Sequence, residues 1–439
     1  MKKIKAVAFI MLFLFLFITV SVVAEISMTD VNCRWLTEFY NEPDNSLDAV
    51  YIGSSNCYTF WEPNYAWKNY GITVYPYSSP SQPLTVTEYM IKEAVKKQPN
   101  AVFIVNTNSI DKDIDDVICH RLLDNMPVSK NKKNLSNYLL KSADISFSQR
   151  MQFYLPLISY HEFWRNPNGE AFSSRSDELK GRNLYYWSFN KTTDISEVYL
   201  KTEKCGSVSD EISESIESLL DYCDSENIKI LFVTVPRAER TIETVEKINT
   251  INKMITDRGY PIVDLSDDPK KAYINPVTDY FNDRHTNIHG ALKFTDYLSK
   301  YLVEKYEFTD KRQDAAYESW NKSYKAFLKM FSPYITDFEL DFEHRDFYLP
   351  TPKESKAYIK SGKAFISWKT VENAEGYSVY RSEEKGNWQF IADTTDSDYC
   401  DKSIKPDKEY SYIVVAYRFE NKEKIYGNYK YNGVAASVE

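Results

Sequence analysis

A serine near the amino terminus and a histidine far along the chain are the residues best placed for chemistry. Gly53-Ser54-Ser55 directly follows a short apolar run, and Asp283-Arg284-His285 directly precedes an amphipathic stretch. A histidine that accepts a proton from a serine makes the hydroxyl a nucleophile for acyl transfer. We therefore predict that a serine of this turn, Ser54 or Ser55, is a nucleophile and that His285 is its general base.

This pair can react only if the intervening elements bring it together. Near-continuous apolar runs predict strands at residues 47–53, 101–105, 228–235 and 261–265. Amphipathic stretches predict helices at residues 86–97, 209–225, 245–258 and 290–306. This alternation predicts an α/β domain over about residues 30–308, with a parallel sheet covered on both faces. Ligands bind at the carboxyl ends of such strands, where we expect this serine turn and His285 to meet.

Two further segments accompany this domain. Residues 112–205 are rich in aromatic side chains and exceed an ordinary connection, so they predict an inserted subdomain. It is either a structural cap with its own small core, or a lid and aromatic wall for the substrate. Apolar residues then recur at intervals of three or four over residues 310–331, which predicts a helix that packs back on the α/β domain.

The carboxyl-terminal segment changes character. Residues 364–368, 377–380, 388–391 and 410–417 alternate with period two and are separated by polar turns. Ile366–Trp368, Asn373–Arg381 and Ile404–Pro406 leading to Tyr410 resemble a fibronectin type III domain. The resemblance implies that Trp368 fills the core between two sheets and that the Tyr410 hydroxyl ties its strand to the preceding turn. Such modules serve as spacers or as adaptors that face carbohydrate or protein.

The amino terminus indicates export. Lys2, Lys3 and Lys5 precede an uncharged apolar run from Ala6 to Val23, followed by Ala24. Positive charge before an apolar run is typical of an export signal, and the run is close to the roughly 20 residues of a spanning helix. Residues 1–24 are therefore a cleaved signal peptide or a membrane anchor. Both place the rest of the chain outside the cytoplasm, secreted or anchored to the outer face of the membrane.

Composition argues against several other classes. The chain carries 54 Lys and Arg against 63 Asp and Glu, a net charge of -9, so we expect no nucleic-acid partner. His285 and His289 are the only closely spaced histidines and have no glutamate between them, so we expect no metal site and no cofactor. The six cysteines lie far apart and form no C-x-x-C pair, and sequence alone does not pair them.

Two blocks of sequence resemble the SGNH (GDSL-like) hydrolase superfamily. Asp48–Ser55 is similar to its first block, and Tyr280–Leu298 is similar to its last block, in which Asn287 and Gly290 fit the opening of the final helix. The resemblance is to the exported branch that acts on acyl groups of cell-envelope polymers. It implies a flavodoxin-like, three-layer α/β fold with a helical insertion, in which Ser55 is the nucleophile and His285 the base.

The supporting residues depart from the family pattern. Where the family carries Asp three residues before the base, this chain has Asn282, and an amide there would select the wrong imidazole tautomer. We predict Asp283 as the supporting acid, with Asp279 as a more distant alternative. The resemblance also implies an oxyanion hole made by the backbone N–H groups of Ser55 and Ser79 and by the side chain of Asn106, with Asn108 as the alternative.

These observations predict an extracytoplasmic, serine-dependent acyl esterase or O-acyltransferase. Its substrate would be an acyl ester, in particular an acetyl ester, of a surface glycan or of a small molecule. The alternative is a non-catalytic, degenerate SGNH-fold surface protein that binds glycan or organises an envelope complex. The predicted organisation is a signal or membrane anchor at 1–24, an SGNH-like domain at 25–308 with its insertion at about 112–205, a helix and linker at 309–351, and the fibronectin-like domain, an all-β sandwich, at 352–439.

Overall fold

A five-stranded parallel sheet forms the centre of the α/β region. The computed structural model describes residues 2–28, 33–110, 112–143, 145–146, 153, 179–182, 200–237, 240–266, 269–272, 274, 279–340, 349–420, 422–427, 429–430 and 433–438. The strands are β1 (Ala49–Gly53), β2 (Val74–Ser78), β3 (Val102–Asn106), β4 (Ile230–Thr234) and β5 (Ile262–Asp264). Their order, β2-β1-β3-β4-β5, is that of flavodoxin-like doubly wound sheets.

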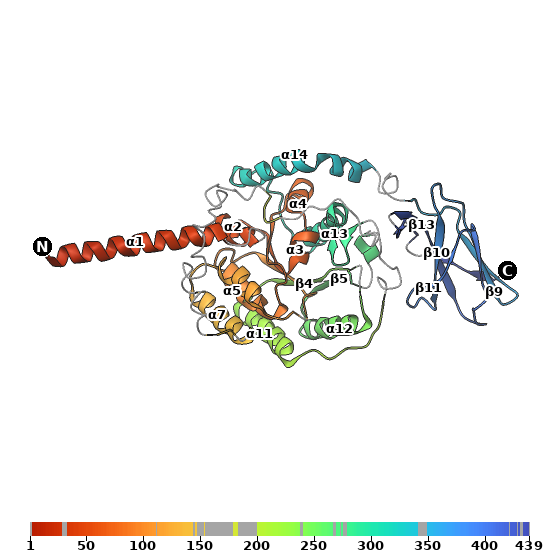
Figure 1. Cartoon of the computed structure of the whole chain (residues 1–439), viewed down its shortest axis with the longest axis horizontal. Coiled ribbons are helices and arrows are strands. Elements are labelled where there is room, and N and C mark those ends of the chain that lie inside the picture. The colour runs from red at the N-terminus through yellow and green to blue at the C-terminus, as the bar shows by residue number, and fades with distance from the viewer. Residues whose placement is uncertain are drawn as a thin grey trace.

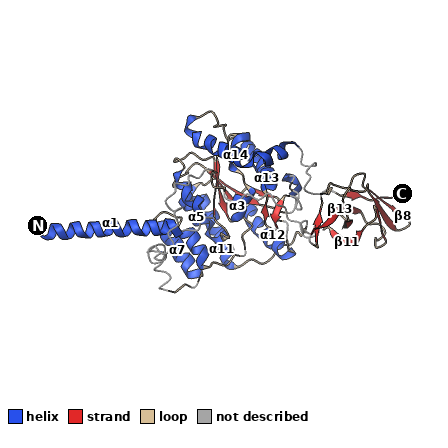
Figure 2. Cartoon of the chain, turned by 45° about the horizontal axis from the view of Figure 1, so that its top comes forward, coloured by secondary structure: helices blue, strands red, loops and turns tan. Residues whose placement is uncertain are grey.

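Helices cover both faces of this sheet, as Figures 1 and 2 show. One face carries α3 (Ser55–Phe60), α4 (Pro63–Tyr70) and α13 (Ile288–Tyr306), and the other carries α5 (Thr87–Ala94), α6 (Asp116–Leu123), α7 (Lys130–Ser142), α11 (Asp210–Glu226) and α12 (Ile242–Asp257). Alternate residues of one strand serve the two cores: Tyr51 packs with Phe60 and Phe294, and Val50 packs with helices of the opposite face. Burial on both faces explains the near-continuous apolar runs.

Several short elements connect these layers. They are α2 (Arg34–Glu38), η2 (Phe39–Asn41), η3 (Leu84–Val86), η5 (Pro269–Ala272), β6 (Tyr280–Asn282) and β7 (His285–Thr286). The predicted strands and helices of the α/β region are present within a few residues of their expected bounds. Of the predicted insertion, α6 and α7 are described, whereas residues 154–178 and 183–199 lie outside the described residues.

A long helix packs on the α/β region as expected. After η6 (Ala315–Tyr317), α14 runs over Glu318–Leu340, beginning and ending later than the predicted 310–331. Its Phe327 and Phe331 pack against Ile288 and Leu292 of α13. Figure 1 shows α14 above α4 and α13.

The carboxyl-terminal region is built from two mainly antiparallel sheets. One has the order β11-β10-β13-β14 with β15 paired to β13, and the other has the order β12-β9-β8-β16. The strands are β8 (Lys356–Lys360), β9 (Lys363–Ser367), β10 (Gly376–Glu383), β11 (Gln389–Thr394), β12 (Asp398–Asp401), β13 (Tyr410–Glu420), β14 (Glu423–Tyr426), β15 (Val434–Ala435) and β16 (Ser437–Val438). Trp368 lies in their shared core, and the N–H of Lys405 donates to the Tyr410 hydroxyl at 2.9 Å. The predicted tie between strand and turn is confirmed.

The first helix, α1 (Lys2–Met28), extends away from the α/β region in Figure 1. Its apolar side chains, such as Phe9 and Leu14, are exposed. Within the described residues, Ile4–Ser21 is the one helical stretch long and apolar enough to cross a membrane, a property that signal sequences share. The six cysteines, all of them described, form no disulfide.

Candidate active site

A tight turn at the end of β1 presents Ser55. Gly53 has a φ of +151°, and a Cβ there would lie 2.8 Å from Cβ of Asn106 and 3.0 Å from Sγ of Cys57. Only glycine allows this backbone conformation and close approach without strain. Ser54 then takes the N-cap position, and Ser55 is the first residue of α3. The sequence therefore places Ser55 at the carboxyl edge of the sheet.

A short hairpin presents His285. Strands β6 and β7 pair Tyr280 with Thr286 and Asn282 with His285, and the Tyr280 hydroxyl donates to the carbonyl of Pro236 beyond β4 at 2.9 Å. The hairpin continues into α13, whose N-cap Asn287 accepts from the backbone N–H groups of His289 and Gly290. These contacts fix the hairpin both to the sheet and to the final helix.

The two predicted reactive residues are in contact. Oγ of Ser55 lies 2.7 Å from Nε2 of His285. The ring of Phe281 stacks on the imidazole with 5.6 Å between the centroids and 13° between the planes. The hydroxyl and the imidazole are therefore within hydrogen-bond reach, as a nucleophile and its general base must be.

Asn282 sets the tautomer of His285. Its Oδ1 accepts the backbone N–H of Arg284 at 2.9 Å and that of His285 at 3.0 Å, so the atom at this position must be the amide oxygen. The same oxygen lies 3.1 Å from Nδ1 of His285. Nδ1 therefore carries the proton and Nε2 accepts from Ser55. The expectation that an amide at this position selects the wrong tautomer is wrong, because two backbone donors prevent the amide from flipping.

The predicted acid is not on the ring. Asp283 is exposed, and among the described residues the side chain bonded to Nδ1 of His285 is Asn282. The alternative, Asp279, pairs with Lys293 at 2.6 Å, and both side chains are buried. The structure thus brings Ser55 and His285 together without Asp283 or Asp279. Asn282 was visible in the sequence, but its orienting role follows from the hairpin geometry.

Burial and positive charge keep His285 neutral. Burial, followed by the positive charges of Arg237, Arg284 and Lys112, lowers the pKa of His285 from its usual value to about 4. Each cause disfavours the imidazolium form. Above about pH 5 the imidazole is therefore unprotonated and ready to accept a proton.

This shift predicts the acidic limb of activity. We expect kcat/KM for ester hydrolysis to fall only as the pH drops through about 4, because activity requires neutral His285. Asn282→Asp places a negative charge beside Nδ1 and should raise the midpoint pH of this acidic limb by roughly 1–3 pH units. The control is Asp283→Asn, which removes a charge not bonded to the ring and should move the limb less. A wild-type limb near 6.5, or no shift in Asn282→Asp, would contradict this assignment.

The predicted oxyanion residues Ser79, Asn106 and Asn108 lie around the serine turn, but their donors are occupied. The backbone N–H of Ser79 donates to the carbonyl of Gly53 at 3.3 Å. Nδ2 of Asn106 donates to Oδ1 of Asn108 at 3.0 Å, and Nδ2 of Asn108 donates to the carbonyl of Val235 at 2.8 Å. Asn56, which follows Ser55, was not predicted to contribute a donor. Its Nδ2 is buried and has no hydrogen-bond partner among the described residues.

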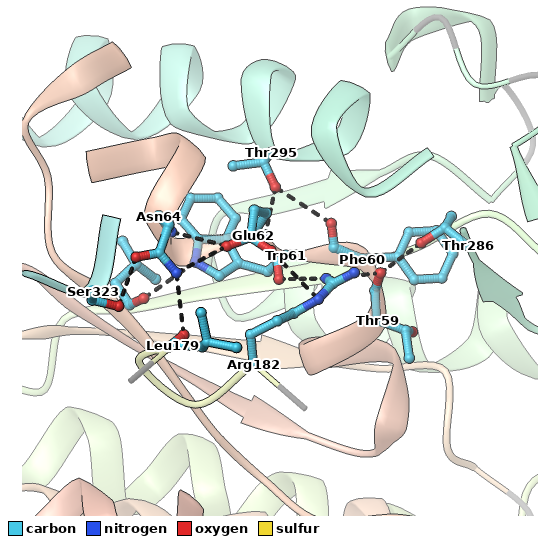
Figure 3. Close-up of polar contacts among 11 residues, drawn as sticks. Thr59, Phe60, Trp61, Glu62, Asn64, Leu179, Arg182, Thr286, Thr295 and Ser323 are labelled. Atoms are coloured by element: carbon cyan, nitrogen blue, oxygen red, sulfur yellow. Dashed lines mark hydrogen bonds and ion pairs between the residues drawn. The ribbon is translucent and has the colours of Figure 1, made fainter. Parts of the chain in front are cut away.

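A buried polar network holds the helix of Ser55 against the strand of His285 (Figure 3). Nη1 of Arg182, in the predicted insertion, donates to the carbonyls of Thr59 at 3.1 Å and Trp61 at 2.7 Å. The hydroxyl of Thr286 donates to the same Thr59 carbonyl at 2.6 Å. Thr286 follows His285 directly and Thr59 lies in α3, so one carbonyl joins the two halves of the site.

The same network reaches α13 and α14. Nε of Arg182 lies 3.5 Å from the Glu62 carboxylate, and both side chains are fully buried. The N–H of Glu62 donates to the Thr295 hydroxyl of α13 at 2.8 Å. Asn64 donates to Glu62 and accepts from Ser323 of α14 at 2.7 Å. Three segments that are distant in sequence, at Arg182, at Thr286–Thr295 and at Ser323, are thereby fixed around α3.

Arg182→Met tests this network. The substitution leaves the buried Glu62 charge without its cation, so we expect the free energy of unfolding to fall by roughly 3–5 kcal/mol. Urea denaturation followed by circular dichroism measures the change. Lys253→Met is the matched control, because its ion pair with Asp257 is exposed and its loss should leave the denaturation midpoint unchanged. Equal midpoints for the two variants would contradict a structural role for Arg182.

Comparisons with known proteins extend over a small part of the chain. No family model and no curated protein matches. Among solved structures, a Fn3-like protein from Clostridium thermocellum is 22% identical with a TM-score of 0.18, and the match covers 21% of this chain and 95% of that chain. FN3tt is 17% identical with a TM-score of 0.18, covering 21% of this chain and 96% of that chain. Pectate lyase Pel3 from Pectobacterium carotovorum is 24% identical with a TM-score of 0.15, covering 18% of this chain and 25% of that chain. Similarity of this extent carries no information on the chemistry at Ser55.

Proposed function

We propose that the protein is an extracytoplasmic, serine-dependent acyl esterase or O-acyltransferase that acts on acyl esters of a surface glycan. The observation that carries this proposal is the 2.7 Å contact between Oγ of Ser55 and Nε2 of His285. Support comes from Asn282, which keeps Nε2 available as an acceptor. A serine whose hydroxyl bonds to a correctly oriented imidazole is the arrangement that acyl transfer requires.

The reaction follows from these contacts. Nε2 of His285 accepts the Ser55 proton as Oγ attacks the ester carbonyl, and the carbonyl oxygen becomes an oxyanion. The imidazolium then protonates the leaving alkoxide as the C–O bond breaks, which leaves an acyl-serine. Water or a sugar hydroxyl attacks the acyl-serine, with His285 again accepting the proton, and His285 returns that proton to Oγ of Ser55 as the acyl–Oγ bond breaks. Water yields the free acid, and a sugar hydroxyl yields a new ester.

Donors for the oxyanion are available at the start of α3. The backbone N–H of Ser55 belongs to the first residue of the helix, where N–H groups have no intrahelical acceptor. In this proposal the buried Nδ2 of Asn56 would be a second donor, and Nδ2 of Asn106, which is bonded to Asn108, would be a third if it exchanged that partner for the oxyanion. Donors held at this position stabilise the charge that develops on the carbonyl oxygen.

The predicted cell-surface location completes the proposal. The apolar α1 serves as a membrane anchor or as a cleaved signal, and either role exports the α/β region with its carboxyl-terminal β region. By analogy with other exported acyl-group enzymes, this location favours an ester of a surface glycan as the substrate.

Two assays on the full chain in detergent test the proposal. Release of acetate from a chromogenic acetyl ester measures hydrolysis, and mass spectrometry of an oligosaccharide incubated with the same donor measures transfer. We expect at least one reaction. Absence of both from folded protein that also fails to react with a fluorophosphonate probe would overturn the proposal.

One observation favours a non-catalytic alternative. The N–H of Ser79 and the amide of Asn106 are bonded to protein acceptors, not held open for an oxyanion. A degenerate hydrolase fold that binds glycan, or organises an envelope complex, needs no such donors. The fluorophosphonate probe separates the two functions, since it labels only an activated serine.

A further inference from the structure

Three segments that carry cationic residues meet at the edge of the sheet where Ser55 contacts His285. Arg284 immediately precedes His285 in the hairpin. Arg237 follows β4, and its Nη2 donates to the carbonyl of Asn108 in the loop after β3 at 3.1 Å. Lys112 lies further along that loop. Three segments that are distant in sequence thus each bring a positive charge to the same edge.

These charges are close enough to act on one another. After burial, the charges of Arg284 and Arg237 lower the pKa of the Lys112 ammonium, whereas Asp113 raises it. All three cations act on His285. Among the described residues, neither Lys112 nor Arg284 forms an ion pair, and the neighbouring carboxylates of Asp113 and Asp283 are exposed. Gathering like charges costs free energy, and a chain with a net charge of -9 has no general surplus of cations.

We propose that the Ser55 site takes an anionic ester, whose phosphate or carboxylate group binds to Lys112, Arg237 and Arg284 while its acyl carbonyl lies at Ser55. This inference rests on the proposed function. Arginine and lysine are the side chains that recognise both kinds of anion, through charge-assisted hydrogen bonds.

An anionic substrate also supplies what the protein lacks at His285. Asn282 orients the ring but carries no charge, so it stabilises the imidazolium less than a carboxylate does. A bound phosphate or carboxylate offsets the three cations, which favours the imidazolium that forms as Ser55 attacks. The substrate thereby raises the basicity of His285 when the reaction needs it.

The test uses the full chain and three acetyl esters with the same leaving hydroxyl: an acetylated methyl glucoside, its 6-phosphate and the corresponding glucuronide. We expect kcat/KM to be at least about tenfold higher for one or both charged esters than for the neutral ester. The phosphate and glucuronide arms identify which anion is preferred. Lys112→Gln and Arg284→Gln should each reduce the ratio of charged to neutral kcat/KM several-fold, whereas the exposed Lys253→Gln should leave it unchanged.

The pH profile gives an independent readout. For the charged ester, the acidic limb of kcat should lie at higher pH than that of kcat/KM, because the bound anion raises the pKa of His285 in the complex. Three results would overturn the inference while leaving the proposed function standing. The three esters could have equal kcat/KM, or both Gln variants could leave the ratio of charged to neutral kcat/KM unchanged. The acidic limbs of kcat and kcat/KM for the charged ester could also coincide. No turnover of any ester, with no fluorophosphonate labelling, would overturn both.

Discussion

Ser55→Ala is expected to lower kcat for ester hydrolysis by roughly four to six orders of magnitude, because it removes the atom that forms the acyl-enzyme. The same variant should lose labelling by a fluorophosphonate probe. Circular dichroism should be unchanged, because Ser55 lies at the carboxyl edge of the sheet and is only partly buried. Acetate release and active-site labelling measure the two effects separately.

Ser54→Ala is the matched control for this experiment. Ser54 is buried, with 3% of the residue exposed, and makes no side-chain capping hydrogen bond to α3. We expect this variant to keep most of its activity and to label normally. Full activity in Ser55→Ala, or loss of labelling in Ser54→Ala alone, would show that Ser55 is not the nucleophile.

His285→Ala is expected to lower kcat by roughly four orders of magnitude or more, since Ser55 then has no general base. The Ser55→Ala/His285→Ala double variant should be no worse than either single variant, because the two residues act as one unit. His120→Ala is the control: this histidine lies on α6, bonds to Asp124 at the end of that helix, and belongs to another part of the fold. Additive losses in the double variant would show that Ser55 and His285 act independently.

Much of the α/β fold was predictable because each buried strand is a continuous run of apolar residues in the sequence. The apolar runs at β1, β3, β4 and β5 appear in sequence since both faces of each strand are covered. Strand β2 was missed because Pro76 interrupts it and lacks an N–H group. It is tolerated because β2 lies at the edge of the sheet.

The reactive residues Ser55 and His285 were predictable from the sequence, but the residues that orient them and set their charge environment were not. Ser55 and His285 are marked by their places after a strand and before a helix. The orientation of Asn282 depends on backbone N–H groups that point at it only once the hairpin forms. Arg182 and the three cations act across segments far apart in sequence, so no local pattern reveals them.

The shared acceptor at Thr59 has a practical consequence for anyone who shortens or transplants the segment that carries Arg182. Removing that segment takes away one of the two donors that hold the end of the serine helix, while Thr286 remains. Loss of activity in such a deletion mutant would then result from displacement of Ser55. It would not show that the deleted segment contacts the substrate.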